Sequence, residues 1–306
     1  MTTERPLLIG TVTLDYLHEG PIGRALPPAA LQWGGVIHNV ACAMAARGSD
    51  PLFLTAEYTG DLAPAVDAHL AAHGVERIAL PAPTPLPLFE AQLVDGSVID
   101  MHFVGQAALD LLTPELLGAR PELFDQASVI VSGTDSHPAT LAWLCATARE
   151  RGIPFWLLSA DPTEVHKLVP DGEQATFVSL NARELSLWAG TELPGLPGLP
   201  HGSDLSDLSA HEAIAAARKL VDSDGHVLVT LGAQGSVLVP GDGGALLHQP
   251  APTVNGQPLT VGAGDILFAC LLAARLAPTP WAEALREAAA LTTAYLTTPT
   301  YAALRP

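Results

Sequence analysis

Residues 260–275 read TVGAGDILFACLLAAR, two glycines that bracket an alanine just ahead of an aspartate and a strongly apolar helix. Glycines at a helix start let backbone N–H groups approach an anion, and the helix dipole attracts negative charge there. The dipole favours the ionised form of Asp265, which can then deprotonate a hydroxyl group while the amides hold a phosphoryl group. The alternative is a loop-to-helix junction whose aspartate only complements the dipole.

Around this stretch, short apolar runs rich in β-branched residues alternate with segments of helical period. The pattern predicts strands at 7–12, 51–55, 128–132, 153–158, 176–179, 227–230 and 236–239, and helices at 36–47, 63–73 and 138–151. This alternation predicts an α/β fold with a doubly wound, mostly parallel sheet flanked by helices. Active sites in such sheets gather at the carboxyl ends of the strands.

Two regions interrupt the alternation. Residues 86–103 read as a hairpin with an Asp-Gly turn at 95–96, and we expect it to form a small β lid with strands from 10–33. Residues 190–209 are rich in proline and glycine, which is typical of an exposed insertion without a role in chemistry. We therefore predict a single domain over 1–306, with lid strands within 10–33 and 86–104.

Composition narrows the class of protein. The chain has 306 residues, is 48% hydrophobic, and carries a net charge of −18 from 32 acidic and 14 basic residues. Such a surface does not suit nucleic acid, which needs clustered Lys and Arg, whereas a small anion can still be held by backbone amides. The three cysteines have no CxxC spacing and read as reduced core residues. With no signal peptide and no apolar run of membrane-spanning length, we expect a cytoplasmic protein that does not bind membranes.

Further polar residues are candidates for ligand binding. Gly34 and Gly35 precede a helix and permit a ligand to approach the backbone closely, and Asn39 offers a donor and an acceptor to hydroxyl groups. Asp15 follows the first strand and can accept hydrogen bonds from a sugar. The alternative for Gly34, Gly35 and Asn39 is a tight turn with a buried asparagine whose hydrogen bonds are all made within the protein. The alternative for Asp15 is a turn or cap residue.

Two more polar segments follow strands. Asn181 and Glu184 have the spacing of a capping box, or else both face a magnesium ion through its waters. Thr230, Gly232 and Gly235 suit the phosphates or ribose of a nucleotide, or else form a plain glycine turn into the next strand. The sequence contains no GxxxxGK[ST], HExxH, CxxC or GxSxG motif. The eleven histidines show no metal-ligand spacing, and we interpret most of them as surface or core residues.

The order GGxxxN near 35, NxxE near 181, TxGxxG near 230 and GAGD near 262 resembles the ribokinase/PfkB family of carbohydrate and nucleoside kinases over nearly the whole chain. The resemblance implies ATP-dependent phosphorylation of a sugar hydroxyl. It implies that Asp265 is the catalytic base and that the amides of Gly262, Ala263 and Gly264 form the anion hole. It also implies that Asn181 and Glu184 bind Mg²⁺ and the phosphates, and that the nucleotide site is lined by Thr230, Gly232 and Gly235. The acceptor would be held by Asp15, Gly34, Gly35 and Asn39.

Within that family the chain is most similar to the pseudouridine kinases. Residues 34–39, GGVIHN, resemble their GGVxRN, with His38 in place of arginine. Residues 89–97, the Asp-Met pair at 100–101, LTPEL at 112–116 and DPTEVHK at 161–167 resemble other segments of that group. The resemblance implies the 5′-hydroxyl of pseudouridine as acceptor, with Met101 in the acceptor site. A sugar kinase of the same family and a non-catalytic, degenerate kinase are the alternatives.

The segment ahead of GAGD departs from the family. Many members have Asp-Thr-Thr there and use its acidic residue in a monovalent-cation site, whereas this chain has Leu259, Thr260 and Val261. We therefore do not expect a K⁺ requirement. Ile99, Met101 and Phe103 alternate along the predicted lid and could pair with a second subunit, so we expect a possible homodimer through the lid.

Overall fold

The computed structural model describes residues 5–22, 30–94, 97–105, 107–190, 208–254 and 258–305. The predicted turn at 95–96 and most of the predicted insertion at 190–209 therefore lie outside the described residues. A nine-stranded sheet forms the body. Its order is β13 (Leu247–Gln249), β12 (Ser236–Pro240), β11 (Val221–Thr230), β10 (Ala175–Asn181), β9 (Phe155–Leu158), β8 (Ala127–Gly133), β1 (Arg5–Ile9), β4 (Leu52–Thr59) and β5 (Glu76–Pro85).

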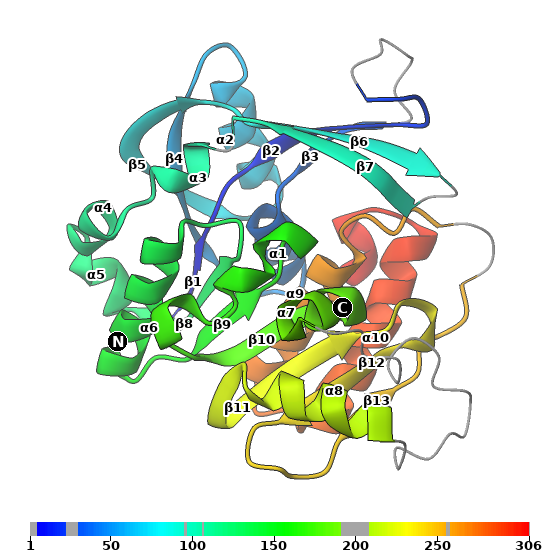
Figure 1. Ribbon diagram of the computed structural model, residues 1–306. Coiled ribbons are helices and arrows are strands. Elements are labelled where there is room, and N and C mark those ends of the chain that lie inside the picture. Colours follow the sequence, from blue (N-terminus) through cyan, green and yellow to red (C-terminus); the bar gives the residue numbers. More distant parts are fainter. Residues whose placement is uncertain are drawn as a thin grey trace.

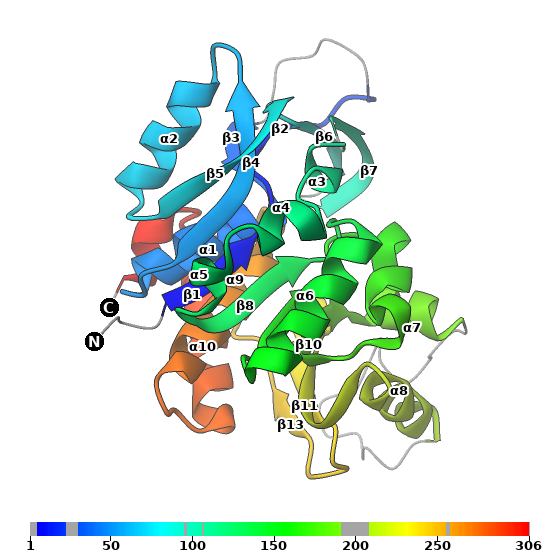
Figure 2. The ribbon, with the colours of Figure 1, turned by 90° about the vertical axis from the view of Figure 1, so that its left-hand side faces the viewer.

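Neighbouring strands in this sheet run parallel from β11 to β5, and only β12 and β13 are antiparallel to their neighbours. Helices cover both faces (Figures 1 and 2). One layer contains α1 (Val36–Ala46), α2 (Ala63–Ala72), α9 (Ala263–Leu276) and α10 (Trp281–Thr297). The other contains α4 (Pro114–Gly118), α5 (Pro121–Phe124), α6 (Pro138–Arg151), α7 (Ala182–Ala189) and α8 (Leu208–Arg218). The predicted fold class is confirmed.

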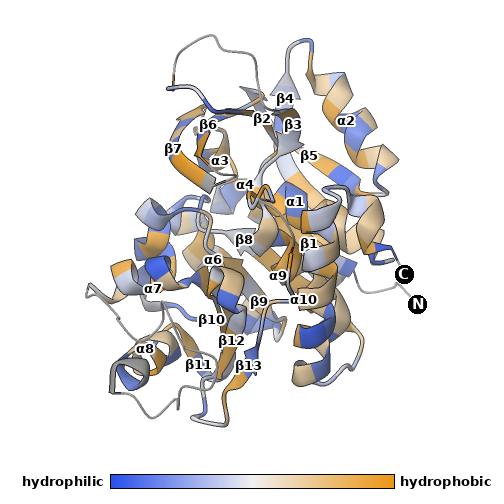
Figure 3. Ribbon diagram, turned by 90° about the vertical axis from the view of Figure 1, so that its right-hand side faces the viewer, coloured by the Kyte–Doolittle hydropathy of each residue, from blue (hydrophilic) through white to orange (hydrophobic). Residues whose placement is uncertain are grey.

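Alternation within the strands explains the two layers. Leu7 and Ile9 of β1 join one hydrophobic core cluster, whereas Leu8 between them joins the other. Successive side chains of a strand point to opposite faces, so a strand covered on both faces reads as a continuous apolar run. Helix α9 is coloured as apolar along most of its length in Figure 3, because it packs between the sheet and both α1 and α10.

A second sheet of four strands stands apart from the body (Figure 1). Its order is β3 (Ala30–Gly34), β2 (Thr13–His18), β6 (Leu88–Val94) and β7 (Ser97–Val104). Two segments distant in sequence supply it, and we call this sheet the lid. The predicted first strand at 7–12 was too long, because the chain leaves the large sheet after Ile9 and begins the lid at Thr13.

The lid has two distinct faces. Leu17, Ala91 and Leu93 form a small core cluster with Leu259 and Val261 of the body, so their face looks toward the body. The remaining elements are short connections: α3 (Ala107–Asp110), η1 (Pro162–Lys167), η2 (Pro170–Gly172), η3 (Gly232–Gln234) and η4 (Tyr301–Leu304). None of the helices in the described part of the chain is long and apolar enough to cross a membrane.

Candidate active site

Helix α9 begins at the centre of the site. Gly262 is its N-cap residue, with a φ of 78° that favours glycine, and Asp265 lies in the first turn. Ala263 donates its N–H to the carbonyl of Thr260 at 3.1 Å, so this amide is already engaged within the turn. A Cβ added to Gly264 would meet no protein atom within 4 Å, so the helix start is open on this side. The predicted arrangement of glycines at a helix start is present.

Asp265 is held by the beginning of α1. Asn39 donates from Nδ2 to Asp265 Oδ2 at 2.8 Å, and Asn39 Oδ1 accepts a hydrogen bond from the hydroxyl of Tyr301 at 3.0 Å. Burial, together with repulsion by Asp135, Asp15 and Glu184, raises the pKa of Asp265 to about 7, even though the Asn39 hydrogen bond lowers it. The prediction that Asp265 stays ionised at neutral pH considered only the helix dipole, whereas burial and the neighbouring carboxylates favour the protonated form.

Asp15 reaches the site from the lid. It lies on β2 and accepts a hydrogen bond from Thr13 Oγ1 at 2.5 Å. A Cβ at Gly34 would stand 2.0 Å from Asp15 Oδ2, so only glycine leaves room for this carboxylate. Burial raises the pKa of Asp15 to about 6. Gly35, with a φ of 107°, would place a Cβ 2.4 Å from the carbonyl oxygen of Thr11, so its first role is to let two backbone segments meet.

Asn181 and Glu184 form a complete capping box at the start of α7. Asn181 Oδ1 accepts from the Glu184 N–H at 2.9 Å, and Glu184 Oε2 accepts from the Asn181 N–H at 2.8 Å. The capping box, one of the two interpretations of this segment, is therefore present. Glu184 is also buried, and its burial raises its pKa to about 6.

Thr230, Gly232 and Gly235 lie beside this box. Thr230 ends β11 and is the register partner of Asn181 at the end of β10. Gly232 faces open space, whereas a Cβ at Gly235 would stand 2.0 Å from the carbonyl oxygen of Gln249. Gly235 is therefore required by the turn into β12, and Gly232 is the open member of the pair.

The loop after β8 contributes a carboxylate that the sequence reasoning missed. The Oδ1 atom of Asp135 is buried and accepts no hydrogen bond from any residue that the structure describes. Burial raises the pKa of Asp135 to about 6, and the charge of Lys167 opposes this rise. Because Asp135 follows a buried strand, the rule that ligands gather at the carboxyl ends of parallel strands could have found it.

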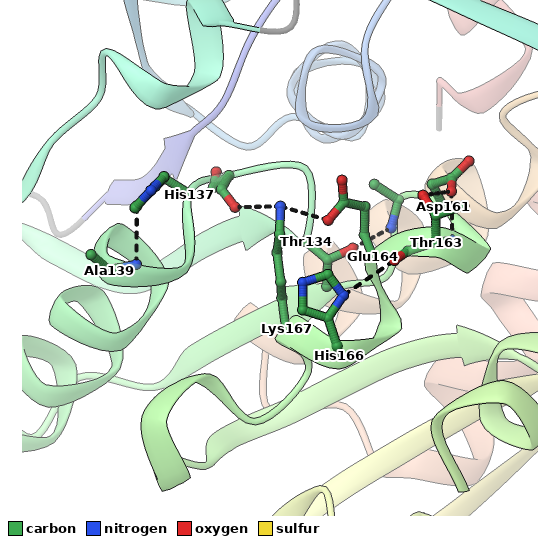
Figure 4. Close-up of polar contacts among 10 residues, drawn as sticks. Thr134, His137, Ala139, Asp161, Thr163, Glu164, His166 and Lys167 are labelled. Atoms are coloured by element: carbon green, nitrogen blue, oxygen red, sulfur yellow. Dashed lines mark hydrogen bonds and ion pairs between the residues drawn. The ribbon is translucent and has the colours of Figure 1, made fainter. Parts of the chain in front are cut away.

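The segment 161–167 forms a compact turn after β9 beside this loop (Figure 4). Lys167 pairs with Glu164 at 2.6 Å and donates to the carbonyl oxygen of Ser136 at 3.3 Å. Asp161 caps the turn by accepting from the N–H of Thr163 at 2.6 Å. One of the two lysines of the chain, Lys167, thus lies at an otherwise acidic edge of the sheet.

Met101 lies on the lid face that looks toward the body. It pairs with Ala91 across the β6–β7 hairpin, and Phe103 pairs in the same way with Phe89, so each pair shares a face. Two of the three side chains expected to contact a second subunit therefore point toward the site. A hollow of about 350 Å³ at the lid is lined mainly by residues of the opposite face, Leu14, Tyr16, Leu31, Leu88, Glu90 and Val104, and also by Phe89.

The comparisons with known proteins agree with this geometry. A family model described as pfkB family carbohydrate kinase matches residues 27–302. The structure resembles ribokinase of Arabidopsis thaliana complexed with ribose and ATP, with a TM-score of 0.76, 20% identity, and coverage of 99% of this chain and 96% of that chain. It also resembles adenosine kinase from Sinorhizobium meliloti, with a TM-score of 0.78, 17% identity, and coverage of 99% and 96%.

A carbohydrate kinase from Agrobacterium tumefaciens is similar as well, with a TM-score of 0.72, 21% identity, and coverage of 98% of this chain and 93% of that chain. The search of curated proteins found no match. Fold and site define a phosphotransferase that uses an alcohol group as acceptor. The chain belongs to the pfkB family of carbohydrate kinases.

Proposed function

We propose that this protein is an ATP- and Mg²⁺-dependent nucleoside kinase that phosphorylates the 5′-hydroxyl of pseudouridine. The observation that carries the proposal is the position of Asp265 at the open start of α9, held by Asn39. A carboxylate held by a neutral donor can take a proton from a hydroxyl group. The adjacent helix start favours the negative charge of a phosphoryl group.

Asp265 acts as the general base in this proposal. Its pKa is raised to about 7, close to physiological pH, where a base combines a useful ionised fraction with sufficient basicity. The Asn39 carboxamide orients the carboxylate through Oδ2 and leaves Oδ1 for the acceptor hydroxyl. The remaining N–H groups of the turn at Gly262 and Gly264 would hold the transferring phosphoryl group, since the N–H of Ala263 is engaged by Thr260.

The phosphate donor and its metal ion would lie along the acidic edge of the sheet. An ATP complex of one structural relative and an ADP complex of another support ATP as donor. The carboxylates of Asp135 and Glu184 fit Mg²⁺, which prefers oxygen ligands and often keeps its waters; the buried Asp135 Oδ1 has no hydrogen-bond donor among the described residues. Bound there, Mg²⁺ would neutralise phosphate charge. Thr230 and Gly232 would contact the nucleotide.

The acceptor would lie between Asp15 and the lid face that looks toward the body. Asp15 is the register partner of Phe89, so its carboxylate shares a face with that ring, and Phe103 pairs with Phe89 at a centroid separation of 6.4 Å. A polar group for ribose hydroxyls beside aromatic side chains and Met101 suits a sugar joined to a planar base. This arrangement favours a nucleoside over a free sugar.

ADP release measured against a panel of nucleosides and sugars tests the proposal. We expect turnover of pseudouridine well above that of ribose, fructose and aminosugars. Turnover of a free sugar with none of pseudouridine would overturn the acceptor and leave the kinase class intact. A protein that binds ATP but turns over no member of the panel would support the degenerate, non-catalytic alternative.

A further inference from the structure

Three donors of the kind that bind transition metals meet between α1 and α2. His38 and Cys42 lie one turn apart on α1 and are fully buried, and His69 reaches them from α2 and is partly buried. His38 Nε2 lies 2.9 Å from His69 Nε2 and 3.6 Å from Cys42 Sγ, and all three donor atoms lie within 4.8 Å of one another. The sequence reasoning missed this cluster because His69 is distant along the chain.

The hydrogen bonds around His38 determine which of its nitrogens carries the proton. Asn39 must donate from Nδ2 to the Asp265 carboxylate, so its Oδ1 is an acceptor. His38 Nδ1, 3.0 Å from that oxygen, must therefore be the protonated nitrogen. The lone pair of His38 Nε2 then points to the place where His69 and Cys42 meet. A protein oxygen that accepts from the far nitrogen is the usual support of a metal-bound histidine.

The donor set and its spacing select the ion. Two imidazoles and a thiol suit Zn²⁺ and related transition metals and do not suit Mg²⁺, which prefers oxygen. Bonds of about 2.0 Å to nitrogen and 2.3 Å to sulfur, in tetrahedral geometry, place donor atoms roughly 3.3–3.6 Å apart. The separations of His38 Nε2 from His69 Nε2, 2.9 Å, and from Cys42 Sγ, 3.6 Å, lie close to this range. The histidine–histidine contact needs to open by only a few tenths of an ångström.

Aromatic and imidazole rings pack around the two histidines. His73 and Trp33 pack against the ring of His69, and Tyr301 packs edge-on against His38. His69 is only partly buried, so this cluster of donors borders the surface of the molecule.

We propose that His38, Cys42 and His69 form a binding site for a transition-metal ion of the Zn²⁺ class, with the fourth position left to water. The site is separate from the oxygen ligands assigned to Mg²⁺. The ion replaces the thiol proton of Cys42, which passes to solvent or buffer. The proton between the two histidines moves from Nε2 to Nδ1 of His69, so His69 binds the ion as a neutral imidazole. It also fixes the ring of His38 and, through Asn39, the side chain that holds Asp265.

The test is metal binding by the full chain after dialysis against a chelator, with Zn²⁺ and Co²⁺ as probes. We expect one Zn²⁺ per chain in competition with a chromophoric chelator. Co²⁺ should give the visible absorption of a tetrahedral ion together with a thiolate-to-cobalt band in the near ultraviolet. Zn²⁺ should also raise the thermal midpoint of unfolding, because an ion that binds only the folded state stabilises it. None of these readouts depends on kinase activity.

Two ligand variants and two controls complete the design. His69→Ala should weaken Zn²⁺ binding at least 100-fold, and Cys42→Ala should remove the thiolate-to-cobalt band. Cys270→Ala, at another buried cysteine, and His166→Ala, at an exposed histidine, should behave as the parent protein. If Cys42→Ala fails to fold, His69→Ala still decides, because its ring is only partly buried. Absence of tight binding by the parent, or equal binding by His69→Ala, overturns the proposal.

Discussion

Asn39 donates a hydrogen bond to Asp265 across 226 positions of sequence, with 2.8 Å between Nδ2 and Oδ2. The contact joins the first turn of α1 to the first turn of α9, two helices that pack against each other. Because Asn39 Oδ1 is also engaged, by Tyr301 and His38, the carboxamide cannot rotate without losing several bonds. Asn39 was expected to bind the acceptor, and its observed partners make it first a support for the base.

Asp265→Asn removes the proposed base and retains the size of the side chain. We expect turnover to fall by roughly 10²–10⁴-fold, the usual contribution of a general base, with little change in ATP binding. ADP release and calorimetric titration with ATP measure the two quantities. Unchanged turnover would falsify the role assigned to Asp265.

The pH dependence of kcat/KM should report the raised pKa of Asp265. Only the ionised carboxylate accepts a proton, so activity should fall about tenfold per pH unit below about pH 7 and level off above it. The Asn39 hydrogen bond lowers this pKa, so Asn39→Ala should move the profile to higher pH. A profile that stays flat between about pH 5.5 and 8 contradicts this prediction.

The same group makes stability depend on pH. The pKa of Asp265 is raised from 3.8 to about 7, so between these values the folded protein binds more protons than the unfolded chain. The contribution of Asp265 to the free energy of unfolding is therefore fully present below about pH 4 and is lost as the pH rises to 7. Asp265→Asn should thus be more stable than the parent at pH 8, by about 1–3 kcal/mol, allowing for solvent in the site.

Urea unfolding at pH 8 and pH 4.5 measures this difference, which should shrink at the lower pH. Asp61→Asn, at an exposed position, is the matched control and should leave the stability unchanged at both pH values. A variant less stable than the parent at pH 8 would show that the hydrogen bond from Asn39 outweighs desolvation.

Gly34→Ala should disturb the acceptor site selectively. The new Cβ would stand 2.0 Å from Asp15 Oδ2, so the carboxylate must move. We expect KM for the acceptor to rise tenfold or more, about 1.4 kcal/mol, with KM for ATP unchanged. Gly118→Ala, whose Cβ would lie 3.4 Å from Trp143, is the control. Equal KM values for parent and Gly34→Ala would remove Asp15 from the acceptor site.

Gly264→Ala tests the anion hole. Its Cβ would meet no protein atom within 4 Å, so the fold should tolerate it, and alanine in a helix stabilises by about 0.5–1 kcal/mol relative to glycine. The methyl group would, however, occupy space proposed for the phosphoryl group. We expect reduced turnover in a protein at least as stable as the parent, measured by ADP release and thermal unfolding. Full activity would contradict an anion hole at Gly264.

Local patterns predicted most of the fold because the interactions behind them are local. The helix at 138–151 was predicted with the observed bounds, and the strand at 128–132 lies within the observed β8. The two layers of the core, one on each face of the large sheet, follow from the positions of apolar residues along each strand. The end of β1 was misplaced because the apolar run continues after the chain has left the large sheet at Ile9. Gly10, the next residue, lies so close to Ile37 that a Cβ would stand 2.6 Å away.

Long-range contacts of the site were beyond the sequence. Nothing local to Tyr301 indicates that its hydroxyl reaches Asn39, and nothing local to His69 indicates that it meets His38. The raised pKa of Asp265 arises from burial and from carboxylates on three other segments, which its position in the first turn of a helix does not reveal. Such effects depend on how distant helices and strands pack together, and local sequence patterns do not predict that packing.

Leu259 and Val261 pack against Leu17 and Ala91 of the lid. Only Gly262, Ala263 and Gly264 separate this contact from the base. Any tilt of the lid would therefore be transmitted through three residues to the first turn of α9, which couples the lid mechanically to the proposed base.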